Sequence, residues 1–150
     1  EEVGEAFSQL EQQGKVLHFG VSNFDARQLE LLQSGLSQPL CANQMQFSLM
    51  HAGMISTLGS QYRHFPFADR DGEVLDYCRL HQVTVQAWSP FQYGFFEGVF
   101  IDNEKFPQLN EKLGECSEKY GISKTALAVA WILRHPAKIQ TIVGTTNSDG

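Results

Sequence analysis

The chain has 150 residues, of which 42% are hydrophobic and 19% charged, a composition typical of one globular domain and not of a disordered or fibrous segment. Its net charge of −6 comes from scattered Asp and Glu, and its 11 Lys and Arg are dispersed, which argues against nucleic acid as a partner. No apolar run reaches the roughly 18 residues of a membrane-spanning helix, and the first residues are acidic, unlike a basic leader. We therefore expect an unsecreted cytoplasmic protein.

The cysteines and histidines do not form ligand or redox motifs. Cys41, Cys78 and Cys116 are too widely spaced for a C-x-x-C pair, so we expect buried free thiols in a reducing compartment. The five histidines, at positions 18, 51, 64, 81 and 135, show no pairing with each other or with carboxylates at ligand spacing. The sequence therefore predicts no metal site.

The first third of the chain predicts a helix, a strand and a second helix. Apolar residues spaced three, one and three apart over residues 3–10 indicate an amphipathic helix, which Gly14 would end. Residues 16–21 read as a short buried strand. Asp25, followed by Gln28 three residues later, has the pattern of a capping box at the start of a helix.

The middle of the chain predicts a strand over 40–47, a helix over 72–80 and a buried strand over 83–88. Residues 50–71 have weak periodicity and contain glycines and a proline, so we expect a long loop with at most one helical turn. Long loops in compact domains are usually functional.

The last third opens with an aromatic-rich loop over 89–106 and a polar helix over 108–119. Ser123 would cap a strongly apolar helix that ends before Pro136, and a last strand is expected over 139–143. In the apolar helix we predict two faces, one of Ala126, Val129, Ala130 and Leu133 and the other of Leu127 and Trp131.

Alternating strands and helices predict right-handed βαβ crossovers and a parallel sheet. An open doubly wound sheet and part of a (β/α)8 barrel both fit, and periodicity does not choose between them. No G-x-G-x-x-G opens a helix, and polar residues follow each predicted strand, which favours a barrel. Those strand ends are Ser22-Asn23, Asn43-Gln44, Trp88-Ser89 and Thr145-Thr146-Asn147.

Four ordered segments resemble the signatures of the aldo-keto reductases. Residues 14–24 (GKVLHFGVSNF) are similar to G-K-(V/I)-R-x-(F/I)-G-V-S-N-F, and residues 43–47 (NQMQF) to N-Q-x-(E/Q)-(Y/F). Residues 87–91 (AWSPF) are similar to (A/G)-(Y/W)-S-P-L, and residues 144–147 (GTTN) to the closing G-(S/T)-(S/T)-(N/R). The resemblance implies that residues 1–150 are a single partial domain, the C-terminal half of an α/β (β/α)8 TIM barrel, about strands 5 to 8.

The resemblance also implies a nicotinamide cofactor, NADP with NAD as the alternative, and a small-molecule aldehyde, ketone or alcohol as substrate. A carboxamide needs both donors and acceptors, which hydroxyl and amide side chains supply, and an aromatic face suits a flat ring. The resemblance implies that the carboxamide is contacted by Ser22, Asn23 and Gln44 and that the nicotinamide ring is stacked on Trp88. It also implies that the pyrophosphate loop contains Ser89 and Phe91, and that the residues near the adenosine phosphate are Thr145, Thr146 and Asn147.

Plainer interpretations of these residues stay open. Ser22-Asn23 fits a turn before a helix, and Trp88 alone fits an ordinary core residue. The aromatic loop fits simple packing over a site as well as substrate contact. His18 reads as an ordinary strand residue, because the family's catalytic histidine ends an earlier strand.

The family's catalytic Asp, Tyr, Lys and His match no position here. The tyrosines at 62, 77, 93 and 120 fit no such motif, so we nominate no catalytic residue and expect the chain alone to be inactive. The leading hypothesis is an oxidoreductase in the full-length parent. The alternatives are a non-catalytic nicotinamide-binding regulatory subunit and a partial product without stable function.

Overall fold

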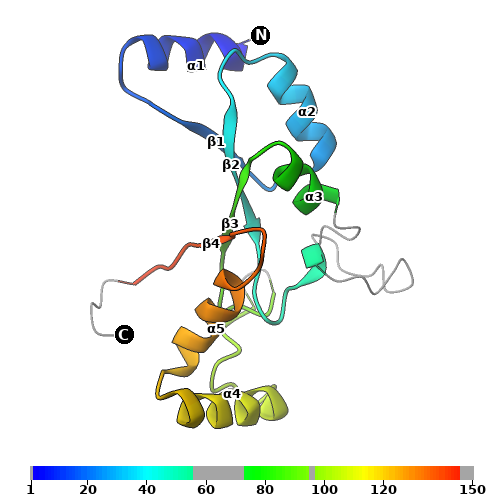
Figure 1. Ribbon diagram of the computed structural model, residues 1–150, viewed down its shortest axis with the longest axis vertical. Helices are drawn as coiled ribbons and strands as arrows, with labels where there is room; N and C mark the ends of the chain where they lie inside the picture. Colours follow the sequence, from blue (N-terminus) through cyan, green and yellow to red (C-terminus); the bar gives the residue numbers. More distant parts are fainter. Residues whose placement is uncertain (1, 56–72, 95–96, 146–150) are drawn as a thin grey trace. The chain divides into compact units, whose positions relative to one another are not determined.

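The computed structural model describes residues 2–55, 73–94 and 97–145, and Figure 1 shows its helices and strands. The chain divides into two compact units, one of residues 1–45 and 53–86 and the other of residues 46–52 and 87–150. We describe each unit by itself.

The first unit begins with α1 (Glu2–Gln12), and Gly14 follows with φ of 66°. That left-handed conformation is the one glycine adopts without strain, so the predicted helix and its stop are confirmed. β1 (Phe19–Ser22) starts three residues later than predicted. Leu17 is 79% exposed and His18 is exposed too, so the expectation that His18 is a strand residue is wrong: it precedes the strand.

Phe7 of α1 stacks on Phe19 of β1 with ring centroids 4.2 Å apart and an interplanar angle of 18°. Phe19 is buried, whereas the residues just before it are exposed. The stacked rings therefore pack α1 against the first residue of β1.

The predicted capping box at Asp25 is confirmed at the start of α2 (Ala26–Ser34). The Gln28 amide donates to Asp25 Oδ1 over 2.7 Å, and the Asp25 amide donates to Gln28 Oε1 over 2.9 Å. Two N–H groups that the first turn leaves without helical partners are satisfied in this way. The helix begins directly after the loop at the end of β1, so the box also fixes where that loop ends.

β2 (Leu40–Gln46) confirms the second predicted strand and pairs with β1 in parallel. The register pairs Ser22 with Gln44, and it contains an irregularity between Phe19 and Gly20. A Cβ at Gly20 would lie 2.8 Å from the Ala42 carbonyl oxygen. The close approach of the two strands therefore requires glycine at this position.

The rest of the first unit contains η1 (Gly53–Ile55), α3 (Glu73–Leu80) and most of β3 (Thr84–Trp88). The helix and the strand confirm the predictions for 72–80 and 83–88. Of the loop predicted over 50–71, the structure describes the single turn of η1, and the residues from 56 onward lie outside the described part. Within the sheet the strand order is β1-β2-β3-β4, where β4 is the short strand Gln140–Thr141.

The second unit contains α4 (Pro107–Tyr120), α5 (Lys124–Leu133) and the short β4 (Gln140–Thr141). Ser123 caps α5 as predicted, because its Oγ accepts from the Ala126 amide over 3.1 Å. β4 is shorter than the run 139–143 that the sequence predicted.

The predicted faces of α5 are partly wrong. The buried residues of the helix are Ala128 and Ile132, whereas Ala126 and Ala130 are exposed and Leu133 is 53% exposed. An almost wholly apolar helix has no polar stripe to orient it, so periodicity alone did not choose the buried side.

Among the described residues of the second unit, a stacked aromatic pair and a hydrophobic cluster contribute to the core. Fully buried Phe47 stacks on Trp131 at a centroid distance of 5.3 Å. Phe100, Leu113 and Ala128 form the other cluster, joining the loop after β3 to both helices. Leu49, Phe91, Tyr93, Ile101, Phe106, Leu109 and Leu127 pack around this second cluster.

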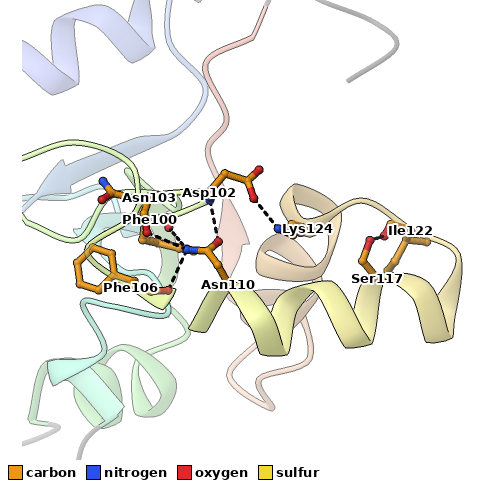
Figure 2. Close-up of polar contacts among 8 residues, drawn as sticks. All are labelled: Phe100, Asp102, Asn103, Phe106, Asn110, Ser117, Ile122 and Lys124. Carbon is orange, nitrogen blue, oxygen red and sulfur yellow. Dashed lines mark hydrogen bonds and ion pairs between the residues drawn. The ribbon is translucent and has the colours of Figure 1, made fainter. Parts of the chain in front are cut away.

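The loop after β3 is tied to α4 through Asn110, as Figure 2 shows. Asn110 Nδ2 donates to the carbonyl oxygens of Phe100 (2.8 Å), Phe106 (3.0 Å) and Asn103 (3.3 Å). Its Oδ1 accepts from the Asp102 amide over 2.7 Å. One side chain therefore holds the backbone of the whole stretch from Phe100 to Phe106.

The three cysteines are free thiols, as expected, but only Cys78 is buried, and Cys41 and Cys116 are half-buried. In the described part of the chain, no group of three or more His, Cys, Asp or Glu could hold a metal ion. None of the described helices is both long and apolar enough to cross a membrane.

Candidate functional site

The end of β1 carries two of the predicted site residues. Ser22 Oγ donates to the Gln44 carbonyl oxygen over 3.2 Å, and the Asn23 amide donates to the same oxygen over 2.8 Å. Asn23 has φ of 59°, a left-handed conformation that Asn tolerates better than most residues. Both side chains are exposed, so both are accessible to a ligand.

Asn43 holds the loop that contains these residues. It is fully buried, and its Nδ2 donates to the Phe24 carbonyl oxygen over 2.8 Å while its Oδ1 accepts from the Phe24 amide over 3.4 Å. Both backbone groups of the residue after Asn23 are thereby satisfied. The sequence motif contained Asn43, but sequence reasoning gave it no role.

The expectation that Asn43-Gln44 ends its strand is wrong, since β2 continues to Gln46. The polar pair lies inside the strand, because the pairing with β1 extends to Gln44 and the chain stays extended beyond it. Ser22 and Gln44 are paired in this register, and paired residues of adjacent parallel strands project from the same face of a sheet.

A third polar residue extends this pair into β3. Gln44 Nε2 donates to Gln86 Oε1 over 3.0 Å, and both side chains are half-buried. Val85, whose side chain projects from the opposite face of β3, is only 2% exposed. We call Ser22, Gln44 and Gln86 the polar row, whose hydroxyl and amide side chains are exposed or half-buried.

The chemistry of the polar row and Asn23 fits a primary carboxamide. Such a group offers one acceptor oxygen and two N–H donors. The Ser22 hydroxyl proton is used by the Gln44 carbonyl, which leaves the lone pairs of Ser22 Oγ as acceptors. Gln44 Oε1 is a second acceptor, and the Asn23 side chain contains an amide donor. Nothing in this set would hold a metal ion or a phosphate by charge.

The other predicted residues lie in the second unit. Trp88 is half-buried, and its carbonyl accepts from the Phe47 amide over 3.4 Å. Ser89 follows with φ of 50°, and its carbonyl accepts from the Gln92 amide over 3.1 Å in a tight turn. A left-handed non-glycine residue is uncommon, and such conformations gather at functional sites.

Ser48 supports this turn. It is fully buried and donates to the Gln92 carbonyl over 2.7 Å, while its Oγ accepts from the amides of Met50 (3.2 Å) and His51 (3.0 Å). Phe91 packs against the cluster of Phe100, Leu113 and Ala128, and its carbonyl accepts from the Phe100 amide over 3.0 Å. No pattern in the sequence distinguished Ser48 from other serines.

Of the residues predicted to lie near the adenosine phosphate, Thr145 is exposed, and Thr146 and Asn147 lie outside the described residues. Tyr93 of the aromatic loop packs edge-on against Phe106 at 4.9 Å, and Lys105 Nζ lies 3.1 Å from its hydroxyl. Of the aromatic side chains predicted for this loop, these two therefore pack on each other.

Burial lowers the pKa of His51, which follows Ser48 in the second unit, below the ordinary value for histidine. Desolvation disfavours the charged imidazolium, so the neutral form is stabilised. No histidine in the described residues belongs to a cluster that could bind a metal ion.

Solved structures share this architecture. A thermostable aldo-keto reductase in complex with the inhibitor epalrestat matches with a TM-score of 0.67 at 24% identity, covering 97% of this chain and 44% of that one. An aldo-keto reductase from Klebsiella pneumoniae in complex with NADPH matches with a TM-score of 0.65 at 21% identity, covering 97% and 43%. The protein therefore has the aldo-keto reductase fold, an α/β fold with a parallel sheet.

The family follows from the sequence. The model of the aldo/keto reductase family matches residues 1–150, and the chain belongs to this family. It is 35% identical over 148 residues to a 6-dehydroglucose reductase of Agrobacterium fabrum, covering 98% of this chain and 43% of that protein. The resemblance carried by the four motifs is confirmed, and the chain spans less than half the length of the curated relative.

Proposed function

We propose that this chain is the cofactor-binding part of an NADP(H)-dependent oxidoreductase that reduces small aldehydes or ketones to alcohols. The observation that carries the proposal is the pairing of Ser22 with Gln44 in a member of the aldo/keto reductase family, which sets a hydroxyl and an amide side by side. NADPH in the related Klebsiella structure supports the choice of cofactor. When bound, it would supply the hydride.

Each predicted residue has a proposed part in holding the cofactor. In the first unit, Ser22, Asn23 and Gln44 would bind the carboxamide, and their exposed or half-buried side chains leave room for it. In the second unit, Trp88 would offer an aromatic face to the nicotinamide ring. The backbone of the turn at Ser89 and of Phe91 would line the pyrophosphate, and Thr145, Thr146 and Asn147 would approach the adenosine phosphate.

The proposal extends to the parent protein. We place residues 1–150 as one partial domain in the C-terminal half of a (β/α)8 barrel, about strands 5 to 8, of a cytoplasmic protein. The catalytic Asp, Tyr, Lys and His of the family would lie outside this chain, which alone would be inactive. The coverage of 43% of the Agrobacterium relative and the three free thiols support these statements.

The test uses the full-length protein and compares substitutions of Trp88 with a control substitution of Trp131, the second tryptophan of this segment. NADPH and NADH are titrated by calorimetry against the wild type, Trp88→Ala, Trp88→Phe and Trp131→Phe. We expect Trp88→Ala to weaken NADPH binding several-fold, Trp88→Phe to retain most of it, and Trp131→Phe, whose ring stacks on Phe47, to leave it unchanged.

A panel of aldehydes and ketones then tests turnover. Reduction of at least one class with oxidation of NADPH would support the oxidoreductase. Tight cofactor binding with no turnover across the panel would favour the regulatory subunit instead. Absence of binding to either dinucleotide would refute the proposal.

A further inference from the structure

Gln46, the last residue of β2, contains a buried hydrogen-bond donor without a partner. The residue is 7% exposed, and among the residues that the structure describes its Nε2 has no hydrogen-bond acceptor. Leaving a buried donor unpaired costs free energy, so such groups are uncommon in native structures, and a bound ligand is one source of the missing acceptor. Neither the sequence motifs nor the cofactor contacts proposed above give Gln46 a role.

The strand pairing places Gln46 beside Trp88, within the second unit. The Phe47 amide donates to the Trp88 carbonyl over 3.4 Å. Ser22 and Gln44 show what such a bond implies, since they are paired and the residue after Ser22 donates to the Gln44 carbonyl. By the same pattern Gln46 is paired with Trp88. Paired residues of adjacent parallel strands project from the same face, so the two side chains are neighbours on that face.

The neighbour of Trp88 on its other side is apolar. The Ile142 amide donates to the Ala87 carbonyl over 2.9 Å, which by the same pattern pairs Thr141 with Ala87. The next residues along the two strands, Ile142 and Trp88, therefore lie opposite each other, and Ile142 is 37% exposed. A flat ring stacked on Trp88 would have an amide donor at the edge toward β2 and a hydrocarbon side chain at the edge toward β4. A nicotinamide ring has two such edges, one with the carboxamide and one with only C–H groups.

We infer that Gln46 is a further cofactor-binding residue whose side-chain NH2 group donates to the carboxamide oxygen of a nicotinamide ring stacked on Trp88. The inference rests on the proposed function and goes further, because it adds a donor and assigns the direction in which the carboxamide points, toward β2. A carboxamide oxygen has two lone pairs, whereas the contacts proposed above supply one donor, the side-chain amide of Asn23. Gln46 supplies the second.

The same contact accounts for the unpaired state of the donor in the free protein. Because the NH2 group of Gln46 forms no hydrogen bond, the amide can rotate about its last torsion, which has broad preferences, and meet an arriving oxygen. Binding then satisfies a donor that the free protein leaves unpaired. Removing the NH2 group should therefore weaken cofactor binding without destabilising the free protein, which is not expected of a glutamine with a purely structural role.

The test measures the binding of four ligands to the full-length protein by calorimetry. Two of them are NADP⁺ and 2′-phospho-ADP-ribose, which lacks the nicotinamide. The third is the 3-acetylpyridine analogue of NADP⁺, which keeps the oxygen but has a methyl group in place of the NH2. The fourth is the thionicotinamide analogue, which keeps the NH2 but has sulfur, a weak acceptor, in place of the oxygen.

Gln46→Met and Gln46→Leu both remove the donor, and Met also keeps the length of the side chain. We expect either substitution to weaken the binding of NADP⁺ and of the acetylpyridine analogue by about five-fold, which corresponds to one neutral hydrogen bond. The affinity for the thionicotinamide analogue should change by less than about two-fold, and that for 2′-phospho-ADP-ribose should not change. The melting temperature of the free protein should stay at or above that of the wild type. Gln108→Met, at an exposed position of α4, is the matched control and should change none of these values.

The outcomes separate this inference from the proposed function. Undiminished NADP⁺ affinity in a Gln46 variant that folds would overturn the inference while leaving the proposed function standing. A variant that only raises KM for the aldehyde would do the same, because the donor would then serve the substrate carbonyl. Equal weakening for all four ligands would also overturn it, because a purely structural role affects them alike. A wild type that binds none of them would refute the proposed function and the inference together.

Discussion

Asn110 allows a test of how the loop after β3 is held, because Asp has the same shape but cannot donate when ionised. The NH2 group of Asn110 has two protons, shared among the carbonyls of Phe100, Asn103 and Phe106, and its oxygen accepts from the Asp102 amide. Counting three net hydrogen bonds at about 1 kcal/mol each, Asn110→Ala should lower the free energy of unfolding of the intact protein by roughly 3 kcal/mol.

Asn110→Asp keeps the contact to the Asp102 amide but loses both donated bonds and turns a carboxylate toward three carbonyl oxygens. We expect a cost of at least roughly 2 kcal/mol at pH 7, despite the unchanged shape. The Asp102 carboxylate adds like charge nearby, and Lys124 is already paired with it over 2.5 Å. The exposed neighbour gives a matched control, since Glu111→Gln should change stability by less than about 0.5 kcal/mol.

The destabilisation caused by Asn110→Asp should depend on pH, and its direction follows from the pKa of the introduced carboxyl group. The carbonyl oxygens favour the protonated form, so the pKa of the introduced carboxyl in the folded protein is raised above its unfolded value of about 3.9. The folded state then binds more protons than the unfolded state between the two pKa values, and the destabilisation grows as the pH rises through that window. It should therefore be smaller at pH 4 than at pH 7.

Urea unfolding measures these differences, and hydrogen exchange distinguishes the two variants. The Asp102 amide should stay protected in Asn110→Asp, which retains its acceptor, and lose protection in Asn110→Ala. An Asp variant as stable as the wild type at pH 7 would refute the view that Asn110 donates to the loop.

Three further changes test other parts of the structure. Asn43→Leu removes two hydrogen bonds to the Phe24 backbone and should cost about 2 kcal/mol in urea unfolding; a cost under about 0.5 kcal/mol would contradict the role of Asn43. Ser89→Gly relieves a left-handed conformation and should stabilise by up to about 1 kcal/mol, whereas Ser37→Gly, outside that region, should not stabilise. For His51, NMR titration should give a pKa below 6.5. The free energy of unfolding should fall as the pH drops through about 6.5, because the unfolded chain binds the proton first. His51→Asn should make this pH dependence weaker.

Local signals predicted local structure well. The capping box at Asp25, the Ser123 cap and the glycine stop at Gly14 each involve residues only a few positions apart, so the sequence contains all the partners of the interaction. The order of helices and strands followed from such signals. The burial of Ala128 did not, because its neighbours in the core, Phe100 and Leu113, come from the loop after β3 and from α4.

The candidate site likewise contains residues that the sequence motifs predicted and residues that they did not predict. The motifs marked Ser22, Asn23 and Gln44, and the structure brings these three together within the first unit. Gln86 and Asn43 were missed, because their roles depend on partners 42 and 19 residues away, set by the strand register and the path of a loop. A single sequence gives no sign of which polar residues in strands will meet.

The bonds between Asn43 and Phe24 involve only backbone groups of Phe24. These two hydrogen bonds are therefore independent of the side chain at position 24, provided that the residue has a backbone N–H, which excludes only proline. Random mutagenesis at this position should therefore diversify the surface beside Ser22 and Asn23 while the main chain keeps its path. At position 24 the side chain can therefore change while the backbone beside Ser22 and Asn23 keeps the conformation that Asn43 holds.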